Sequence, residues 1–315
     1  MEIKGYQIRG ELKTTNSGFS KWGFADKNGK TYFIKEFIDP VYPVYADVLE
    51  PALVERKKRI CKEFEDRTAL LYREINECSD GNLVYIEEFF REGSHYYLTM
   101  EKVAAVSMNL VKRMPREDRI RICKTLIHSI GRMHQRGIVH GDIKLDNIMF
   151  RQLPSGKITA KVIDFDNSFW ESEPPDPEEE VHGDPVYMAP ETFRMMEEEE
   201  GALTRAIDVF ALGLVFHQIF TGELPGFDHS RYDYPFEAVL GGEELSYSYE
   251  IPGEWREMII RMTEKEEEKR ISLVEAEQMW KSPGSRLRST TGETKGAGSS
   301  GESEAGAFFT AAGDL

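Results

Sequence analysis

The sequence predicts an α+β fold of two lobes, with a small, mainly β first lobe at residues 1–103 and a larger, mainly helical second lobe at residues 104–281. Short β-prone runs separated by turn signals occupy much of the first hundred residues. After Val103, apolar residues recur at helical spacing instead. With 315 residues, 40% of them hydrophobic, the chain is long enough to bury a substantial core in each lobe.

The first lobe is expected to hold a five-stranded antiparallel sheet and one long helix. Three β-prone runs come first, YQIRGEL, KWGFAD and TYFIKEF, separated by the turn-like segments TTNSGF and KNGK. Two more runs, NLVYIEEFF and HYYLTMEKV, end the lobe. Between the two groups, residues 53–77 place Ile60, Phe64, Leu71 and Ile75 at helical spacing, which predicts an amphipathic helix.

The second lobe is predicted to be helical, with a tail behind it. Apolar periodicity indicates helices at about 115–136, 204–221, 254–263 and 272–281. From Ser282 the composition changes to Gly, Ser, Thr and Ala with few large apolar residues. Such a segment buries too little surface to offset its chain entropy, so residues 282–315 are expected to be a disordered tail.

The charge balance narrows the class of partner. The chain has 56 acidic and 40 basic residues, a formal net charge of −16 and a pI near 5.0. These values argue against nucleic acid and anionic membrane surfaces as main partners, and they favour a basic protein substrate.

The cysteines and apolar segments suggest a cytoplasmic protein. Three cysteines without CxxC spacing indicate neither a disulfide framework nor a zinc site, and a reducing cytoplasm is the simplest setting. The first residues, MEIKGYQIRGEL, contain no apolar core of signal-peptide length. The most apolar stretch, IDVFALGLVFHQIF, is interrupted by Asp208, His217 and Gln218, so no membrane span is expected.

One polar cluster lies between apolar runs. The stretch GIVHGDIKLDNIMF places His140, Asp142, Lys144 and Asn147 within eight residues. Alone, it could be a turn in which Asp and Asn satisfy backbone groups and Gly141 supplies a positive φ. Four further segments argue for chemistry instead: TYFIKEF with Lys35, VIDFDNS with Asp164, GDPVYMAPE with Glu191, and IDVFALG with Asp208.

In this order, the five segments resemble the conserved motifs of the eukaryotic-like Ser/Thr protein kinase superfamily, over residues from about 5 to 281. The HGD form of the loop is similar to that of bacterial-type members. The resemblance implies ATP and Mg²⁺ as cofactors and transfer of the γ-phosphate to Ser or Thr hydroxyls of a protein. It implies that Asp142 orients the acceptor or takes its proton, that Lys144 contacts the γ-phosphate, and that Asn147 and Asp164 hold the metal.

The resemblance also implies a nucleotide site in the first lobe. Lys35 would contact the α- and β-phosphates, held by a glutamate of the long helix, Glu65 or alternatively Glu63. Met100 takes the gatekeeper position, and Glu101 and Val103 would offer backbone hydrogen bonds to adenine. TTNSGFSKW resembles a glycine-poor form of the phosphate-binding loop, with residues Thr15, Ser17, Gly18, Phe19, Ser20 and Trp22 near the nucleotide.

Two further matches imply structural roles. Glu191 resembles the glutamate of the Ala-Pro-Glu motif, and Arg270 of EKRIS fits its buried partner. Asp208 would hydrogen-bond the backbone of the catalytic loop. His140 is expected to pack and hydrogen-bond rather than transfer protons.

Three departures from the family pattern carry their own expectations. Gly141 replaces the arginine that receives an activation-loop phosphate, and residues 164–191 contain no threonine, so activity without loop phosphorylation is expected. Asp166 replaces the glycine of Asp-Phe-Gly, so the motif should flip less readily. Asp184 replaces a threonine, and it would either take over the contact to Lys144 or impair acceptor binding.

Two alternatives stay open. HGD and IDFD also resemble aminoglycoside and other small-molecule phosphotransferases, although those generally lack GDPVYMAPE and the DVFALG helix. A pseudokinase scaffold is the second alternative. In the tail, RLRSTTGET offers a possible autophosphorylation site at Ser289, Thr290 and Thr291.

Overall fold

The N-terminal lobe is built on one antiparallel sheet with the strand order β1-β2-β3-β4-β6-β5. The strands are β1 (Glu2–Ile3), β2 (Tyr6–Ile8), β3 (Ser20–Lys27), β4 (Lys30–Phe37), β5 (Ile86–Glu92) and β6 (His95–Glu101). The five predicted strands are present, and the two-residue β1 is an addition. The structure is a computed structural model, and it describes residues 1–14, 20–44, 50–106, 113–176, 183–197 and 202–281.

The sheet buries side chains on both faces. On one face Tyr6 packs with Ile34 and Tyr97 in a small core. On the other face Phe37 lies in an aromatic cluster completed by Phe64, Phe89 and Tyr96. Because side chains alternate along a strand, Lys35 of β4 points to the same face as Phe37. That face is covered by the long helix.

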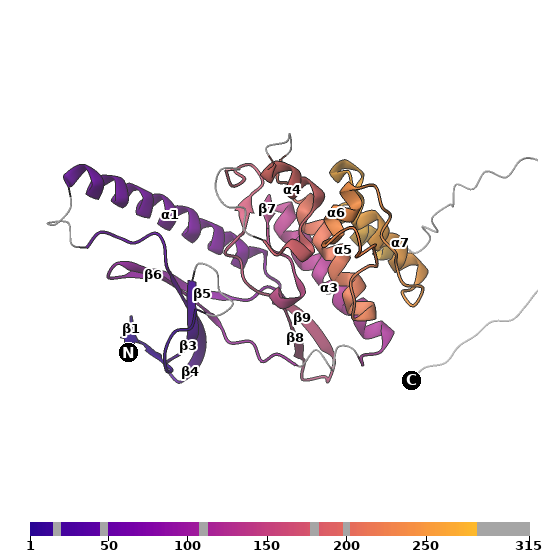
Figure 1. Ribbon diagram of the computed structural model, residues 1–315. Coiled ribbons are helices and arrows are strands. Elements are labelled where there is room, and N and C mark those ends of the chain that lie inside the picture. Colours follow the sequence, from indigo (N-terminus) through magenta and orange to yellow (C-terminus); the bar gives the residue numbers. More distant parts are fainter. Residues whose placement is uncertain (15–19, 45–49, 107–112, 177–182, 198–201, 282–315) are drawn as a thin grey trace, which may run out of the picture. The chain divides into compact units, whose positions relative to one another are not determined.

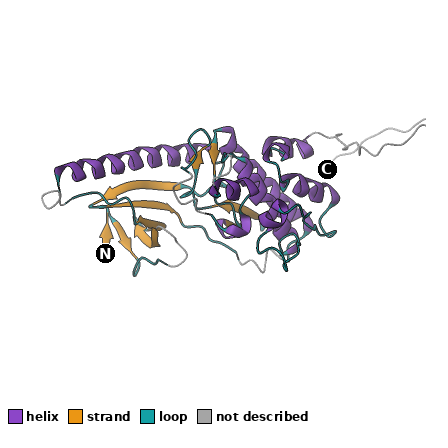
Figure 2. Cartoon of the chain, turned by 45° about the horizontal axis from the view of Figure 1, so that its top comes forward, coloured by secondary structure: helices purple, strands orange, loops and turns teal. Residues whose placement is uncertain are grey.

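This helix, α1 (Pro51–Cys78), confirms the prediction for residues 53–77. It begins with a proline in its first turn, where no intrahelical N–H bond is lost. Figures 1 and 2 show it running alongside the sheet. It buries Val54 and Cys61 in its N-terminal half and Leu71, Tyr72, Ile75 and Cys78 in its C-terminal half, so most of its buried contacts lie toward its C-terminus.

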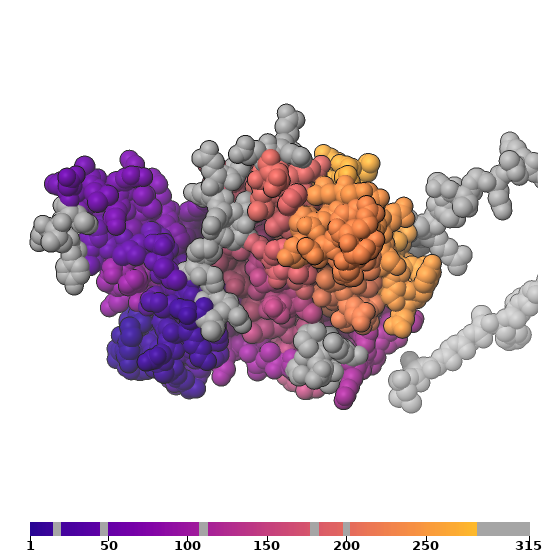
Figure 3. Space-filling model, in the orientation of Figure 1, coloured from indigo at the N-terminus to yellow at the C-terminus, as the bar shows by residue number. Residues whose placement is uncertain are grey.

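The C-terminal lobe contains the four predicted helices, α3 (Arg116–Gln135), α5 (Ala206–Thr221), α7 (Gly253–Met262) and α8 (Leu273–Lys281). Shorter helices are α4 (Pro190–Met196) and α6 (Pro235–Leu240), with 3-10 turns η2 (Leu145–Asn147), η3 (Pro185–Tyr187) and η4 (Glu267–Lys269). Helix α5 buries 13 of its 16 residues and forms the centre of the lobe. In the space-filling view, the two lobes appear as separate groups of colour, indigo to purple and magenta to yellow (Figure 3).

Two short antiparallel pairs position the loops between the lobes. β8 (Ile148–Gln152) pairs with β9 (Ile158–Val162), and β7 (Ile138–Val139) pairs with β10 (Phe169–Trp170). The Ile163 N–H also donates to the Asn147 carbonyl oxygen at 2.9 Å. The stretches 140–147 and 163–168 are therefore held side by side.

Within the described ranges, no helix combines the length and the apolar character that a membrane span needs. The predicted tail at 282–315, with its proposed phosphorylation site, lies outside the described residues.

Candidate active site

A buried carboxylate holds the backbone of the loop at residues 140–147. The N–H groups of His140 and Gly141 donate to the two oxygens of Asp208, at 2.7 and 3.0 Å. His134 contacts the same carboxylate through Nε2 at 2.9 Å. Burial opposes ionisation of Asp208, but the hydrogen bond and charge of His134 outweigh it and lower the pKa of the carboxyl. The predicted role of Asp208 is confirmed.

Gly141 is required by its conformation and by a close approach. Its φ is +79°, and a Cβ atom there would lie well inside contact distance of the Asn167 carbonyl oxygen. His140, fully buried beside it, accepts from the Asp142 N–H through Nδ1 at 3.3 Å. An arginine at position 141 does not fit this backbone, which gives a physical reason for the HGD sequence.

Asp142 lies between an amide and an ammonium group. Asn147 Nδ2 donates to the Asp142 carbonyl oxygen at 2.8 Å and to its Oδ2 at 2.9 Å. Lys144 Nζ lies 2.8 Å from Oδ2 and 3.1 Å from Oδ1 of the same carboxylate. Two of the side chains that the sequence grouped within eight residues, those of Lys144 and Asn147, thus converge on the Asp142 carboxylate.

Lys35 reaches across from the sheet to two aspartates of the second lobe. Its Nζ donates to Asp164 Oδ1 at 2.6 Å and to Asp166 Oδ2 at 2.8 Å, with only 7% of the lysine side chain exposed. Burial alone would lower the pKa of Lys35, but Asp166 and Asp164 outweigh it and raise the pKa. Lys35 in turn outweighs the burial of Asp164 and lowers the pKa of that carboxyl.

The expected partner of Lys35, Glu65, is a wrong prediction. Among the described residues, the ion pairs of Lys35 are with Asp164 and Asp166, and no ion pair joins it to Glu65 or Glu63. Helix α1 lines the cavity beside the site with Phe64, Arg67, Thr68, Leu71 and Tyr72. Glu63 and Glu65 are not among the residues that line it.

The adenine side of the site is partly defined. Met100 is buried and pairs with Phe33 in the neighbouring strand, and Trp22 stacks on Phe33 with ring centroids 5.7 Å apart. Val103 is half-buried, and Ser20 is buried at the start of β3. Four residues predicted to contact phosphate lie outside the described residues: Thr15, Ser17, Gly18 and Phe19.

The backbone N–H of Glu101 is already engaged. It donates to the Tyr85 carbonyl oxygen at 3.0 Å, while the Glu101 carboxylate accepts from the Tyr85 N–H at 2.8 Å. The same carboxylate pairs with Lys161 of β9, which is buried. The Glu101 N–H is therefore not available to adenine, and its side chain links the end of β6 to β9.

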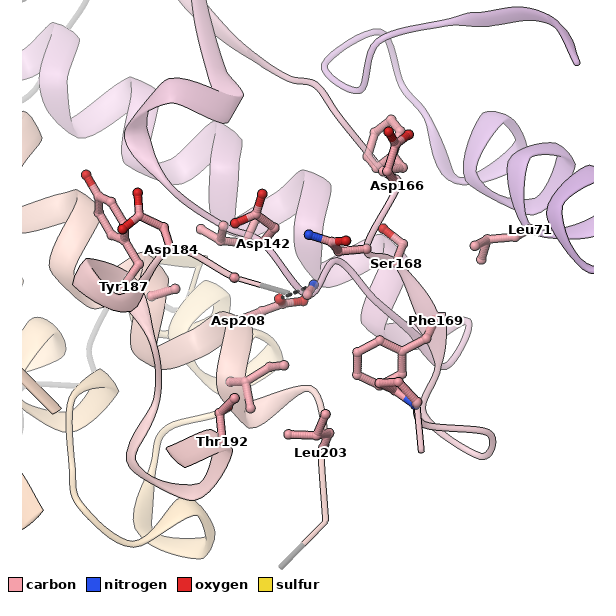
Figure 4. A pocket seen from close by; sticks show the side chains of 18 of the residues that line it. Leu71, Asp142, Asp166, Ser168, Phe169, Asp184, Tyr187, Thr192, Leu203 and Asp208 are labelled. Carbon is pink, nitrogen blue, oxygen red and sulfur yellow. Dashed lines mark hydrogen bonds between the residues drawn. The ribbon is translucent and has the colours of Figure 1, made fainter. Parts of the chain in front are cut away.

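A cavity of about 550 Å³ opens beside the catalytic loop. Asp142 and Asp184 lie on one side of it, and Asp166 lies toward Leu71 of α1 (Figure 4). Asp184 accepts from the Val186 N–H at 3.0 Å and so caps η3. Since the ion-pair partner of Lys144 in the described chain is Asp142, the suggestion that Asp184 takes over the contact to Lys144 is not supported.

The segment after Asp164 is anchored at both ends by ion pairs. Glu171 lies 2.9 Å from Nε of Arg205 and also contacts its Nη2. At the other end, Glu191 is paired with Arg270, with Nη2–Oε2 at 2.7 Å and both side chains 1% exposed. The predicted Glu191–Arg270 pair is confirmed.

Comparison with known proteins agrees with this geometry. A family model described as "Protein kinase domain" matches residues 54–283. The chain belongs to the eukaryotic-like protein kinase superfamily. The matched range begins within α1, so β3 and β4, which carry Trp22 and Lys35, precede it.

This kinase is similar to several Ser/Thr kinases. It is 27% identical over 171 residues to the serine/threonine-protein kinase KIN4 of Saccharomyces cerevisiae, covering 52% of this chain and 20% of that one. It is 25% identical over 280 residues to the probable serine/threonine-protein kinase fhkC of Dictyostelium discoideum, covering 86% and 43%. The chain thus spans less than half the length of these two relatives.

The fold of the kinase matches a solved viral enzyme. The structure of the Cydia pomonella granulovirus kinase PK-1 aligns with a TM-score of 0.61 and 20% identity, covering 86% of this chain and 92% of that one. This likeness includes most of the chain, and it establishes the kinase fold for the two lobes.

Three features of the kinase site could not be found by sequence reasoning. These are the Asp166 and Tyr72 contacts near Lys35, the Glu101–Lys161 pair and the Glu171–Arg205 pair. Asp166 was noticed only as a departure from glycine. The other two pairs join residues distant in sequence, and neither carries a local motif.

Proposed function

We propose that this kinase transfers the γ-phosphate of Mg-ATP to Ser or Thr hydroxyls of protein substrates. The observation that carries the proposal is the arrangement around two carboxylates. Asp142 is held by Asn147 and Lys144, while Lys35 pairs with Asp164 between the lobes. Phosphoryl transfer requires chiefly that groups be positioned and charge be neutralised, and this arrangement supplies both.

The residues fit magnesium. It prefers hard oxygen ligands, and on phosphates it is commonly held by one or two carboxylates. Asp164 offers a carboxylate, and Asn147 uses its amide nitrogen on Asp142, which leaves Oδ1 as the atom of that side chain suited to a metal. The two negative charges of Asp164 and Asp166 exceed the single positive charge of Lys35, which favours binding of a cation. Bound there, magnesium would neutralise charge on the phosphates.

Asp142 and Lys144 would act on the acceptor side. Asp142 lines the cavity, and its carboxylate is held by Lys144 and Asn147, so it can orient an acceptor hydroxyl and receive its proton. Lys144 would neutralise charge on the transferred phosphoryl group. The Asp-x-Lys spacing and the names of the curated relatives support Ser or Thr rather than Tyr as acceptor.

Finer parts of the proposal rest on charge. A net charge of −16 and the acids around the cavity, Asp142 and Asp184, favour substrates with basic residues near the acceptor. The same charge disfavours nucleic acid and membrane surfaces as partners, and a cytoplasmic location fits the three buried free cysteines. The Glu171–Arg205 pair supports activity without loop phosphorylation, because the Glu171 carboxylate already forms an ion pair with an arginine of this region and a phosphate is not needed for that pairing.

A transfer assay with radiolabelled ATP tests the function. The acceptors are a basic Ser/Thr-containing protein and an aminoglycoside, and the variants are Asp142→Asn and its matched control Asp146→Asn, an exposed aspartate of the same loop. We expect label on Ser and Thr of the protein, lost in Asp142→Asn and retained in Asp146→Asn. Label on the aminoglycoside alone would establish a small-molecule kinase, and nucleotide binding without transfer would establish a scaffold.

A further inference from the structure

Lys35 has a carboxylate partner that the motif pattern does not provide. Asp166 stands where the family has a glycine, and its Oδ2 lies 2.8 Å from Lys35 Nζ. The backbone at residue 166 does not have the positive φ that would favour glycine there. Among the described non-glycine residues, positive φ values occur at Lys4, Asn28 and Asp164, not at Asp166. What Asp166 adds is a side chain.

Helix α1 reaches this side chain with a hydroxyl group. Tyr72 is buried, and its hydroxyl donates to Asp166 Oδ1 at 3.4 Å. Burial first, and then the charges of Asp166 and Asp164, raise the pKa of Tyr72 well above its ordinary value, so the hydroxyl stays protonated and able to donate. The two oxygens of Asp166 are thus divided between the sheet and the helix.

We propose that Asp166 is the positioning residue for Lys35 in this kinase, taking the place of a helix glutamate, and that Tyr72 couples helix α1 to Lys35 through it. The proposal rests on the proposed function in assigning Lys35 to the nucleotide phosphates and Asp164 to the metal ion. When Asp164 serves a metal ion, Asp166 remains to hold the ammonium group. Helix α1 then stays connected to Lys35 through the hydrogen bonds from Tyr72 to Asp166 and from Lys35 to Asp166.

The geometry explains why a glutamate is not needed on α1. The residues of α1 that line the cavity are Phe64, Arg67, Thr68, Leu71 and Tyr72, and none of them carries a carboxylate. A carboxylate from the loop, two residues after Asp164, therefore completes the pair. Placing a new carboxylate at Thr68, one turn before Tyr72, should substitute for it.

Binding measurements on four variants test the proposal. Calorimetry gives the Kd of Mg-ATP and of adenosine for the wild type, Asp166→Gly, Tyr72→Phe, Thr68→Glu, and the double variant Thr68→Glu/Asp166→Gly. A hydrogen bond to a charged group is typically worth about 1.5–3 kcal/mol, so Asp166→Gly should weaken Mg-ATP binding about 10- to 100-fold. Adenosine, which has no phosphates, should bind unchanged. Tyr72→Phe should shift Mg-ATP affinity in the same direction by less.

The double variant is the decisive arm. We expect it to bind Mg-ATP more tightly than Asp166→Gly, while Thr68→Glu alone gains nothing because Asp166 is already present. Equal losses for adenosine and Mg-ATP would show a merely structural role and overturn the proposal. Recovery of Asp166→Gly by excess Mg²⁺ would also overturn it, because Asp166 would then be a metal ligand. If the wild type binds Mg-ATP but transfers phosphate to no acceptor, the proposed function fails while this comparison still decides the inference.

Discussion

Asn147 joins itself twice to Asp142 through one amide nitrogen, at 2.8 Å to the carbonyl oxygen and 2.9 Å to the carboxylate. The proposed metal-side residue and the proposed acceptor-side residue are therefore one unit. A displacement of Asn147 moves both halves of the site, which is the kind of positioning that phosphoryl transfer depends on.

Replacing Asn147 should therefore reduce catalysis more than stability. Asn147→Ala removes the donor that orients Asp142 and an oxygen suited to the metal, and we expect kcat to fall on the order of 100-fold or more. Steady-state kinetics measure kcat, with thermal unfolding as a check on folding. An unchanged kcat in a folded variant would contradict the assigned role.

Gly141 should tolerate no side chain. Gly141→Ala combines a positive φ with a collision against the Asn167 carbonyl oxygen, whereas Gly156→Ala has a similar φ of +82° and no neighbour within 4 Å. Backbone strain of this kind costs about 1–3 kcal/mol, and the collision adds to it only at Gly141. Chemical denaturation should show the larger loss for Gly141→Ala, and equal losses would refute the close approach.

The buried Glu191–Arg270 pair should behave as a coupled unit. Removing one partner of a buried ion pair typically costs about 3–5 kcal/mol, because the other charge is left without compensation. We expect Arg270→Met and Glu191→Leu each to be strongly destabilising and the double variant to lose less than their sum. Arg270 also donates to the Glu264, Lys265 and Ala206 carbonyl oxygens, so the double variant should not be neutral. A double-mutant cycle that proves additive would exclude the coupling.

His217 should make stability depend on pH. Burial lowers its pKa below 6.5, and its Nε2 accepts from the Ser248 N–H at 3.2 Å, which requires the neutral ring. Between the folded pKa and 6.5 the unfolded chain binds more protons, so stability should rise with pH there and fall as the solution is acidified. Between about pH 7 and pH 5, the free energy of unfolding should decrease by more in the wild type than in His217→Gln. Parallel curves would rule out His217 as a source of the dependence.

The order of the loop that follows Asp164 should depend on the Glu171 carboxylate rather than on a phosphate group attached to the loop. Phosphatase treatment should leave the activity unchanged, whereas Glu171→Gln should lower it by a few-fold, since a partly exposed pair with Arg205 is worth only about 0.2–1 kcal/mol. The exchanged variant Glu171→Arg/Arg205→Glu should recover part of the loss. Activity abolished by phosphatase would overturn this view of the loop.

The elements that the sequence predicted are those set by local patterns. Residues 53–77 carry an apolar stripe at helical spacing and lie within α1, and the apolar run predicted as a helix at 204–221 contains α5. Asp208 and Arg270 were found because their partners belong to motifs with fixed spacing. Strand β1 was missed, since two residues carry too little pattern to register.

The contacts that the sequence could not predict depend on how separate elements pack. Glu65 follows Phe64 on the helix and was a reasonable partner for Lys35, but the rotation of α1 against the sheet brings Thr68 and Tyr72 toward the site instead. The close approach of Asn167 to Gly141 likewise follows from the pairing of β7 with β10. No local segment of the sequence determines the rotation of α1 or the approach of Asn167 to Gly141.

The proposed metal site is tested most directly by the Mg²⁺ dependence of ATP binding, measured by calorimetry in the wild type and in Asp164→Asn. Mg²⁺ should strengthen ATP binding to the wild type, and Asp164→Asn should lose this gain while remaining folded. Equal Mg²⁺ dependence in the two proteins would contradict a site in which Asn147 and Asp164 hold the metal opposite Lys35.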